Sequence, residues 1–314
     1  MPFGGLEIGY KPMRRVSDKE YRHYLSGQRS VQIEDVEVEL RGTSKIDKLG
    51  PEDYKPETFN VWSFPDRGNW ATHIGNYRGN WSPFIPRNLI MKFSNEGDLV
   101  LDQMMGSGTT LVECKLLNRG AIGIDVNPNA VMVALDRLNF SPNPIDPEHR
   151  APDIAVYEGD ARNLNEVDAE SVDLIATHPP YASIIPYSAK SPIEGDLSKV
   201  HDIKEYISEM RSVADESFRV LKPDRHCAIL IGDTRRKKHH VPIAFRVMQA
   251  FLQSGFVLRE DIIKIQWNMK TTREKWRGSN YDFYLLGHEH LFVFRKPSPS
   301  EKPREFKESM RWWS

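Results

Sequence analysis

The stretch LVLDQMMGSGTTLVECKLLNRGAIGIDVNP, residues 99–128, decides the fold. A short apolar run ends in an acid at Asp102, a glycine-rich turn and a helical stretch follow, and a second apolar run ends at Asp125. Asn127-Pro128 then begins another helix, because proline is favoured in the first helical turn. Strand, glycine turn, helix and strand in this order are typical of a parallel βαβ unit with a right-handed crossover.

Apolar runs and amphipathic stretches continue to alternate beyond this unit. The further runs that we interpret as strands are 153–157, 172–176, 226–231, 256–265 and 288–294, and the main amphipathic stretches between them are 203–221 and 243–252. No helix separates the last two runs, so they are expected to form an antiparallel pair at the sheet edge. The sequence therefore predicts an α/β fold with a mostly parallel seven-stranded sheet and an antiparallel edge hairpin.

The regions on either side of the sheet differ in character. Residues 1–60 are polar and irregular, which predicts an N-terminal arm, and their alternating run at 31–40 is expected to be a short edge strand. Residues 61–297 form the main domain, and residues 298–314 form a C-terminal tail. Within the domain, residues 62–81 contain three Trp, which are costly to leave in water, so this segment is expected to pack on the domain or hold a ligand.

Composition excludes several classes of protein. The 314 residues have a mean hydropathy of -0.55, and no run of about 18 apolar residues predicts a membrane span. The start, MPFGGLEIGYKPMRR, lacks the apolar core of a secretion signal. Two cysteines exclude a disulfide framework and a cysteine-based zinc site and favour a reducing cytoplasm. His288-Glu-His290 lacks a matching Cys or acid cluster, so no metal site is predicted, and the net charge of -1 means that any nucleic-acid surface must come from local clustering.

The glycine turn predicts a binding site for a nucleoside without phosphates. Glycines let a ligand approach the backbone, and the following helix N-terminus offers free amide groups. Asp125 lies about 20 residues further on, where a carboxylate can accept both ribose hydroxyls, and Asp160 is placed to meet an adenine edge. The turn lacks the lysine of a phosphate loop and the third glycine of a dinucleotide fingerprint. S-adenosylmethionine is a ligand of the required kind.

A second motif follows the run at 172–177, which leads into His178-Pro179-Pro180-Tyr181. The two prolines end the strand and remove two N–H donors, so the carbonyl groups here have no local partner. An aromatic side chain follows at once. Because open α/β sheets bind ligands at the carboxyl ends of their strands, this motif predicts a second part of the site.

Together the two motifs resemble those of the DNA amino-methyltransferases, which act on N6 of adenine or N4 of cytosine. That family carries a D-P-F-x-G-S-G-T-T type cofactor motif and a [D/N/S]-P-P-[Y/F/W] catalytic motif, which stand here as LDQMMGSGTT and THPPY. WSPFIPR, residues 81–87, resembles the methionine-side motif, and the order of the three is the gamma-type arrangement. The resemblance covers about residues 60–296 and implies a Rossmann-like class I methyltransferase fold. It makes residues 61–297 the catalytic domain, with DNA-contacting insertions at about 182–202 and 264–287.

The resemblance also implies the roles of individual residues. The expected catalytic residues are His178, Pro179, Pro180 and Tyr181. The residues expected to bind S-adenosylmethionine are Trp81, Ser82, Pro83, Asp102, Met104, Gly106, Ser107, Gly108, Thr109, Thr110, Asp125, Val126, Asn127, Asp160 and Ala161. The Pro179 carbonyl and the His178 side chain would hold the hydrogens of the target amine, while Tyr181 stacks on a base swung out of the duplex. His178 stands where the family usually has Asp, Asn or Ser, and a neutral imidazole can accept the same hydrogen bond.

The target within this chemistry is less sharply indicated. Thr177 before the motif slightly favours N4 of cytosine over N6 of adenine. Methylation at carbon 5 needs a Cys nucleophile after Pro, whereas Cys114 follows Glu and Cys227 follows His. Two alternatives stay open: methylation of an RNA base or of protein glutamine, and a non-catalytic nucleic-acid-binding protein of the same fold.

Two basic clusters are predicted to contact DNA. The first is the run at 235–240, and the second is the loop at 264–277, where cationic and amide groups alternate with Trp as suits phosphates and bases together. The residues expected to bind DNA are Arg235, Arg236, Lys237, Lys238, Trp267, Lys270, Arg273, Trp276 and Arg277. The expected partner is double-stranded DNA with a flipped base, and the expected location is the cytoplasm, on the nucleoid. A restriction endonuclease or a second copy as a further partner stays open.

Overall fold

A nine-stranded sheet forms the centre of the computed structural model within the residues it describes, which are 9–33, 36–77, 79–141, 152–180, 193–267 and 282–310. The strand order is β1-β7-β6-β5-β8-β9-β13-β12-β4. The parallel strands are β5 (Leu99–Asp102), β6 (Gly120–Asp125), β7 (Ile154–Glu158), β8 (Val172–Thr177) and β9 (Leu221–Ile231). An antiparallel pair, β12 (Val257–Ile265) and β13 (His288–Arg295), joins β9 through β13.

All seven strands predicted from the sequence are present, which confirms the α/β class and the mostly parallel sheet. Two short strands extend the sheet beyond this set. β1 (Arg14–Arg15) pairs antiparallel with β7, and β4 (Val61–Ser63) pairs parallel with β12. The antiparallel pair therefore lies one strand inside the edge. Strands of two or three residues are too short to show an alternating pattern, so the sequence did not indicate them.

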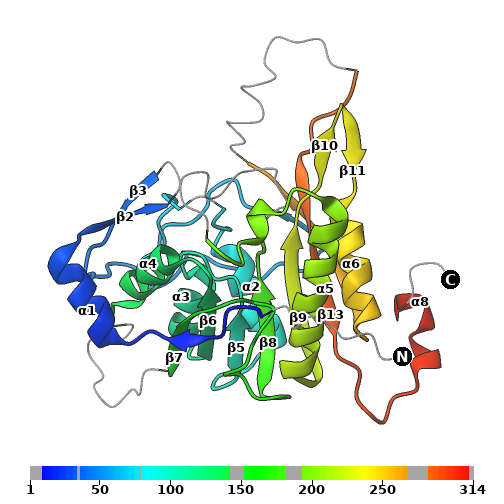
Figure 1. Cartoon of the computed structure of the whole chain (residues 1–314), viewed down its shortest axis with the longest axis horizontal. Helices are drawn as coiled ribbons and strands as arrows, with labels where there is room; N and C mark the ends of the chain where they lie inside the picture. The colour runs from blue at the N-terminus through cyan, green and yellow to red at the C-terminus, as the bar shows by residue number, and fades with distance from the viewer. Residues whose placement is uncertain are drawn as a thin grey trace.

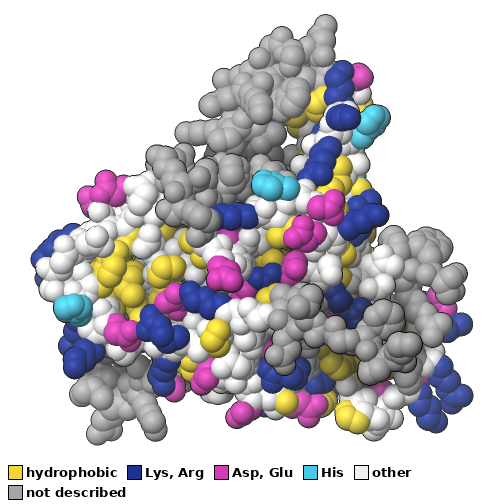
Figure 2. Space-filling view, viewed as in Figure 1, with side chains coloured by type: hydrophobic (Ala, Val, Ile, Leu, Met, Phe, Trp, Pro, Cys, Tyr) yellow, Lys and Arg dark blue, Asp and Glu magenta, His cyan; other side chains and the backbone are white. Residues whose placement is uncertain are grey.

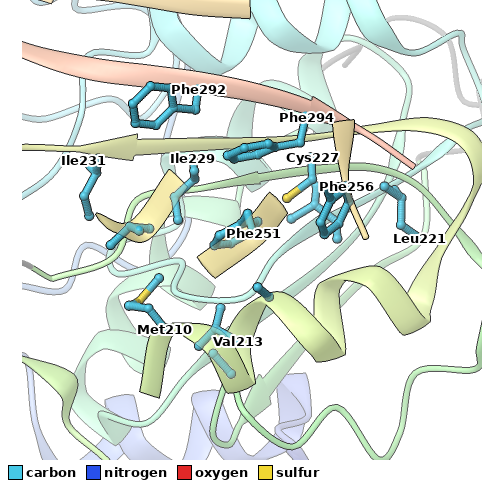
Figure 3. Close-up of a cluster of buried hydrophobic side chains, with 14 of the residues drawn as sticks. Met210, Val213, Leu221, Cys227, Ile229, Ile231, Phe251, Phe256, Phe292 and Phe294 are labelled. Atoms are coloured by element: carbon cyan, nitrogen blue, oxygen red, sulfur yellow. The ribbon is translucent and has the colours of Figure 1, made fainter. Parts of the chain in front are cut away.

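Helices cover both faces of the sheet (Figure 1). On one face lie α2 (Phe84–Phe93), α3 (Thr109–Leu116) and α4 (Pro128–Leu138), and on the other lie α5 (Ile203–Val220) and α6 (Ile243–Gln253). β9 shows why both faces are apolar. Ile229 and Ile231 pack with α5 and α6 around Phe251 (Figure 3). Ala228 and Leu230 point to the opposite face and pack under α2. A strand covered on both sides reads as a continuous apolar run, as the sequence shows.

The N-terminal segment corrects one expectation. The run at 31–40, expected as one edge strand, forms β2 (Ser30–Ile33) and β3 (Val36–Glu39), which pair with each other in a separate two-stranded sheet. Its apolar positions change from odd to even numbers between Ile33 and Val36, and this change is the sign of a reversal. Before the hairpin, α1 (Asp18–Gly27) begins with a capping box at Ser17. The Tyr21 hydroxyl donates to the buried carboxylate of Asp136 at 2.7 Å, which attaches the segment to α4.

The remaining elements lie around the second half of the sheet. β10 (Thr234–Arg236) and β11 (His239–Val241) form a hairpin that projects beyond the sheet (Figure 1). The short helices are η1 (Leu197–Lys199), η2 (Pro303–Glu305) and α8 (Lys307–Met310). The division into arm, domain and tail stays a prediction, although the Arg295 guanidinium ties the last segment to β13 through Glu301 at 2.9 Å. Among the residues that the structure describes, no helix is long and apolar enough to cross a membrane.

Candidate active site

A pocket of about 980 Å³, solvent at its mouth included, opens at the carboxyl ends of β5, β6, β7 and β8. The chain leaves β5 for β6 on one side and later places β8 on the other, and such a reversal of strand order is where α/β sheets bind ligands. The pocket lining consists of Ile33, Tyr77, Gly79, Asn80, Trp81, Asp102, Gln103, Met104, Met105, Gly106, Ser107, Asp125, Val126, Asn127, Gly159, Asp160, Ala161, His178, Pro179, Pro180, Gly195, Asp196 and Leu197.

Asp102 joins the two sequence motifs at the floor of this pocket. Its buried carboxylate accepts a hydrogen bond from the Thr110 hydroxyl, at the start of α3, and from the Thr177 hydroxyl, at the end of β8, the latter at 2.9 Å. Burial raises the pKa of Asp102 to about 6, and the two hydroxyl donors oppose this rise. The glycine turn and the proline motif are therefore held in one rigid unit.

The turn itself needs glycine at two positions. Gly106 and Gly108 have φ values of 51° and 78°, a region that side chains disfavour. A Cβ atom on Gly106 would lie 3.1 Å from the Tyr77 ring, and one on Gly108 would lie 3.0 Å from the Cβ of Ala134. The turn can therefore approach both the pocket wall and α4 only without side chains at these positions.

Asp125 orients the turn from the end of β6. One carboxylate oxygen accepts the Gly106 amide and the other accepts the Asn127 amide, each at 2.9 Å. Each oxygen keeps a second lone pair that can accept a ligand hydroxyl. Burial raises the pKa of Asp125 to about 6, and the two amide donors oppose this rise. Asp125 lines the pocket, and its role as acceptor for the ribose hydroxyls stays a prediction.

Asp160 is held by a contact that the sequence did not indicate. The Arg162 Nε atom and backbone amide both donate to one Asp160 oxygen, at 2.8 and 2.9 Å. The guanidinium also donates to Glu209 at 2.6 Å and lies 4.4 Å from the centre of the Tyr10 ring. These contacts fix the orientation of Asp160, so its edge toward the pocket is preorganised.

One wall comes from a segment expected to contact DNA. Gly195, Asp196 and Leu197 lie in the insertion predicted at 182–202, yet they line the pocket. Gly195 has a φ of 86°, and a Cβ atom there would lie 2.6 Å from the Asp160 carboxylate. No local pattern marks these residues, because their position depends on the packing of the loop against the end of β7.

His178 faces the same pocket from the end of β8. Its ring stacks on Trp81, with centroids 5.8 Å apart and planes at 20°. Burial lowers the pKa of His178 to about 4, while nearby Glu289 and a hydrogen bond to the Gly79 backbone act in the opposite direction. A hydrogen bond that raises a histidine pKa is one that the ring donates, so the second nitrogen of the neutral ring is an acceptor. At neutral pH the imidazole therefore carries an acceptor nitrogen.

The two prolines that follow also line the pocket, and Tyr206 of α5 holds them. Its buried hydroxyl donates to the Pro180 carbonyl at 2.9 Å. The sequence indicated Tyr206 only as part of an amphipathic helix. Tyr181 lies outside the described residues, so its expected stacking role stays a prediction.

The residues expected to bind the cofactor separate into two groups. Those that line the pocket are Trp81, Asp102, Met104, Gly106, Ser107, Asp125, Val126, Asn127, Asp160 and Ala161, and those that do not are Ser82, Pro83, Gly108, Thr109 and Thr110. The second group supports the lining from behind. For example, Thr109 donates to the Asn80 side chain, and Ser82 donates to the Arg67 carbonyl at 2.9 Å. Direct contact with the cofactor therefore stays a prediction for both groups.

The Trp-rich segment at 62–81 supplies the lining residues Tyr77, Gly79 and Asn80, which were expected only as a group. A fully buried carboxylate on α3, Glu113, anchors this segment. Trp70 Nε1 and His73 Nε2 each lie 2.7 Å from one Glu113 oxygen, and Arg87 of α2 donates to the other at 2.8 Å. The wall of the pocket is thus tied to two helices beneath it.

The basic hairpin is partly occupied by its own contacts. Arg235 donates to the carbonyls of Lys238 and Tyr284 at 2.9 and 2.7 Å, and Arg236 donates to the His201 carbonyl at 2.9 Å. Basic side chains lie along the hairpin in Figure 2, with Lys237 and Lys238 at its turn. The Arg235 guanidinium therefore stabilises the hairpin.

The second basic cluster is described only in part. Trp267 is half exposed, and its Nε1 lies 3.1 Å from the Ser63 hydroxyl. Lys264 pairs with Glu289 of β13 at 2.9 Å. Lys270, Arg273, Trp276 and Arg277 lie outside the described residues, and their contact with DNA stays a prediction.

Comparison with known sequences agrees with this geometry. Residues 14–136 and 172–311 match the family described as DNA methylase. The chain belongs to this family. Membership confirms the resemblance seen in the two motifs and identifies S-adenosylmethionine as the cofactor.

Individual relatives cover less of the chain. Type II methyltransferase M.HpaI of Haemophilus parainfluenzae is 37% identical over 94 residues, 28% of each chain. Type II methyltransferase M.MjaI of Methanocaldococcus jannaschii is 28% identical over 177 residues, 48% of this chain and 56% of the relative. DNA adenine methyltransferase YhdJ of Escherichia coli is 27% identical over 125 residues, 39% and 42% of the two chains. The matched stretches thus span at most about half the length of these relatives.

Solved structures include a SAM-dependent methyltransferase of Methanosarcina mazei, with a TM-score of 0.44 and 16% identity, over 67% of this chain and 97% of that one.

The lining of the pocket fits the cofactor of this family. It contains four acids, Asp102, Asp125, Asp160 and Asp196, and among the described residues no Lys or Arg. Such a lining repels phosphate groups and attracts a positively charged sulfonium nucleoside.

Proposed function

We propose that this protein is a DNA amino-methyltransferase that transfers a methyl group from S-adenosylmethionine to an exocyclic amine of a base, N4 of cytosine in preference to N6 of adenine. The observation that carries the proposal is the meeting of His178-Pro179-Pro180 with the acidic nucleoside pocket around Asp125. The cofactor, when bound, supplies an electrophilic methyl group. The protein must bring an amine to it in the correct orientation.

The residues at the end of β8 can orient that amine. Its lone pair is delocalised into the base ring, so it is a poor nucleophile until its hydrogens are held. The proposed acceptors are the Pro179 carbonyl oxygen and the acceptor nitrogen of His178. Trp81 stacks on the His178 ring, and Tyr206 holds the backbone at Pro180. These contacts restrict both acceptors, and positioning of this kind lowers the barrier of a direct transfer.

The preference for cytosine rests on the motif alone. Thr177 is fully buried and its hydroxyl donates to Asp102, so its side chain does not line the pocket that would receive a base. Transfer from labelled cofactor to duplex DNA, followed by identification of the methylated nucleoside, tests the proposal. N4-methylcytosine supports it in full, and N6-methyladenine changes only the target base. Label in RNA or protein alone, or no transfer at all, would overturn it.

Cofactor affinity is expected to fall as the pH is lowered through about 6. Burial raises the pKa of Asp125 to this value, so its carboxyl takes up a proton there and loses an acceptor for the ribose hydroxyls. Calorimetry between pH 5 and pH 8 measures the effect. Asp125→Asn should weaken binding by about 1–3 kcal/mol at pH 8 and flatten the profile. Because the pKa of Asp102 is raised to a similar value, a profile that is unchanged in Asp125→Asn would transfer the role to Asp102.

The hairpin turn is expected to contact DNA phosphates through Lys237 and Lys238. Changing both to Gln should lower DNA affinity and flatten the dependence of log K on log salt by about one unit per lost contact. Arg235 is left intact because it holds the hairpin together. Lys92→Gln, on the exposed end of α2, is the matched control for loss of charge. A salt slope equal to that of the control would show that the turn does not contact DNA.

A further inference from the structure

A second pocket, of about 420 Å³ with the solvent at its mouth included, lies between β3, α4 and residues 71–76 of the Trp-rich segment. It shares no lining residue with the first pocket. Its lining consists of Val38, Glu39, Arg41, Ser44, Lys45, Ala71, Thr72, Ile74, Asn76, Val133, Asp136 and Arg137. Unlike the cofactor pocket, this one contains three cationic side chains.

The floor of this pocket holds a buried arginine with an unused donor. Arg137 is 3% exposed, and its Nη2 atom donates to the Asn76 side chain at 2.8 Å. Its Nη1 atom has no hydrogen-bond partner among the residues that the structure describes. Burial lowers the pKa of Arg137 to about 10, and repulsion from the neighbouring Arg67 adds to this. The guanidinium is therefore charged at neutral pH. Among the described residues it forms no ion pair with a carboxylate, although the charge of nearby Asp136 acts to raise its pKa.

The rim adds positive charge and polar groups. Arg41 and Lys45 are exposed on the hairpin side, and Ser44 lies beside them. The two acids of the lining differ in position. Asp136 already accepts the Tyr21 hydroxyl at 2.7 Å and the Gly42 amide at 2.8 Å, whereas Glu39 is exposed on β3. Three cations thus face two acids, one of which is already bound by other donors.

We propose that this pocket binds a phosphate group. A buried charge is costly unless it is paired, and a guanidinium suits the geometry of phosphate oxygens. Arg137 would contact the anion from the floor, and Arg41 and Lys45 from the rim. The group can come from free phosphate or from a DNA backbone. Residues 71–76 of this pocket continue directly into Tyr77 and Asn80 of the cofactor pocket, so the anion sits on the same wall segment.

A purely structural role for Arg137 makes a different prediction. The residue lies in the last turn of α4, where a cation interacts favourably with the helix C-terminus whether or not an anion is present. In that case loss of the guanidinium would lower stability equally with and without phosphate.

The melting temperature, measured without cofactor, separates the two roles. Inorganic phosphate is compared with chloride at equal ionic strength. Phosphate should raise the melting temperature of the native chain by a few degrees, because a ligand that binds only the folded state stabilises it. Arg137→Met should abolish this rise, and the exposed pair Arg41→Gln and Lys45→Gln should shift it to several-fold higher phosphate concentration, which keeps the test valid if Arg137→Met fails to fold. Lys92→Gln is the control and should respond as the native chain does.

The same rim variant identifies the source of the phosphate. A flatter salt dependence of duplex DNA binding than in Lys92→Gln would identify a DNA backbone phosphate. An unchanged salt dependence, together with a response shifted to higher concentrations of inorganic phosphate, would identify free phosphate. The proposal would be overturned if phosphate did not change the melting temperature of the native chain and the rim variant bound DNA with the same salt dependence as Lys92→Gln. Neither readout uses methyl transfer, so failure here leaves the proposed reaction untouched.

Discussion

His178→Ala is expected to lower the single-turnover rate of methyl transfer by about 100- to 1000-fold, with cofactor affinity unchanged. The change removes one of two acceptors that orient the target amine, while the pocket around Asp125 keeps its contacts. His178→Asn is the informative companion, because its amide oxygen restores an acceptor at nearly the same place. It should be clearly faster than His178→Ala.

The pH profile gives an independent readout of the same residue. Protonation turns the acceptor nitrogen into a donor and adds a charge that repels the amine as it becomes positive. Because burial lowers the pKa of His178 to about 4, the neutral ring persists far below the pH at which an exposed histidine titrates. With saturating cofactor, the rate constant should stay flat through pH 6 and fall only as the pH approaches about 4. A wild-type rate in His178→Ala would make the imidazole structural and assign its role to another group beside Pro179.

Glu113→Ala is expected to destabilise the fold by about 3–5 kcal/mol, because it leaves a partly buried arginine and two buried rings without their common carboxylate. Glu113 is fully buried, and Trp70, His73 and Arg87 all meet its carboxylate. Glu113→Gln keeps one oxygen acceptor but loses the charge beside Arg87, so its cost should be smaller. Urea unfolding of the variants measures both values.

Glu113→Ala should also weaken cofactor binding. The segment that Glu113 anchors continues into Tyr77, Asn80 and Trp81 of the pocket lining, so cofactor affinity should fall together with stability. Glu96→Ala, at an exposed acid near the end of α2, is the control and should stay within about 0.5 kcal/mol of the native chain. If Glu113→Ala unfolds at the same urea concentration as this control, the carboxylate does not anchor the segment.

The strands and the two motifs could be predicted because they depend on neighbours in the sequence. Runs that end at Asp102, Asp125 and Thr177 alternate with helical stretches, and this local order is enough to infer a parallel sheet. Gly106 and Gly108 mark a tight turn because glycine adopts the positive φ angles of this turn without the strain that a side chain adds. The alternation of apolar residues breaks between Ile33 and Val36, and this break indicates the hairpin of β2 and β3. The expectation of a single strand did not take the break into account.

The sequence by itself determined the α/β class, the strand-end acids and the proline motif, because each depends on residues that are a few positions apart in the sequence. The tertiary structure alone decided which distant groups meet. Hydrogen bonds join Glu113 to Trp70, 43 positions apart in the sequence, Tyr206 to Pro180, 26 positions apart, and Tyr21 to Asp136, 115 positions apart. It also decided that His178 is partly buried and stacks on Trp81, and this loss of contact with water lowers its pKa and keeps the ring neutral. Burial and the partners of a buried polar group arise only when separate segments exclude water together, and no local pattern records that event.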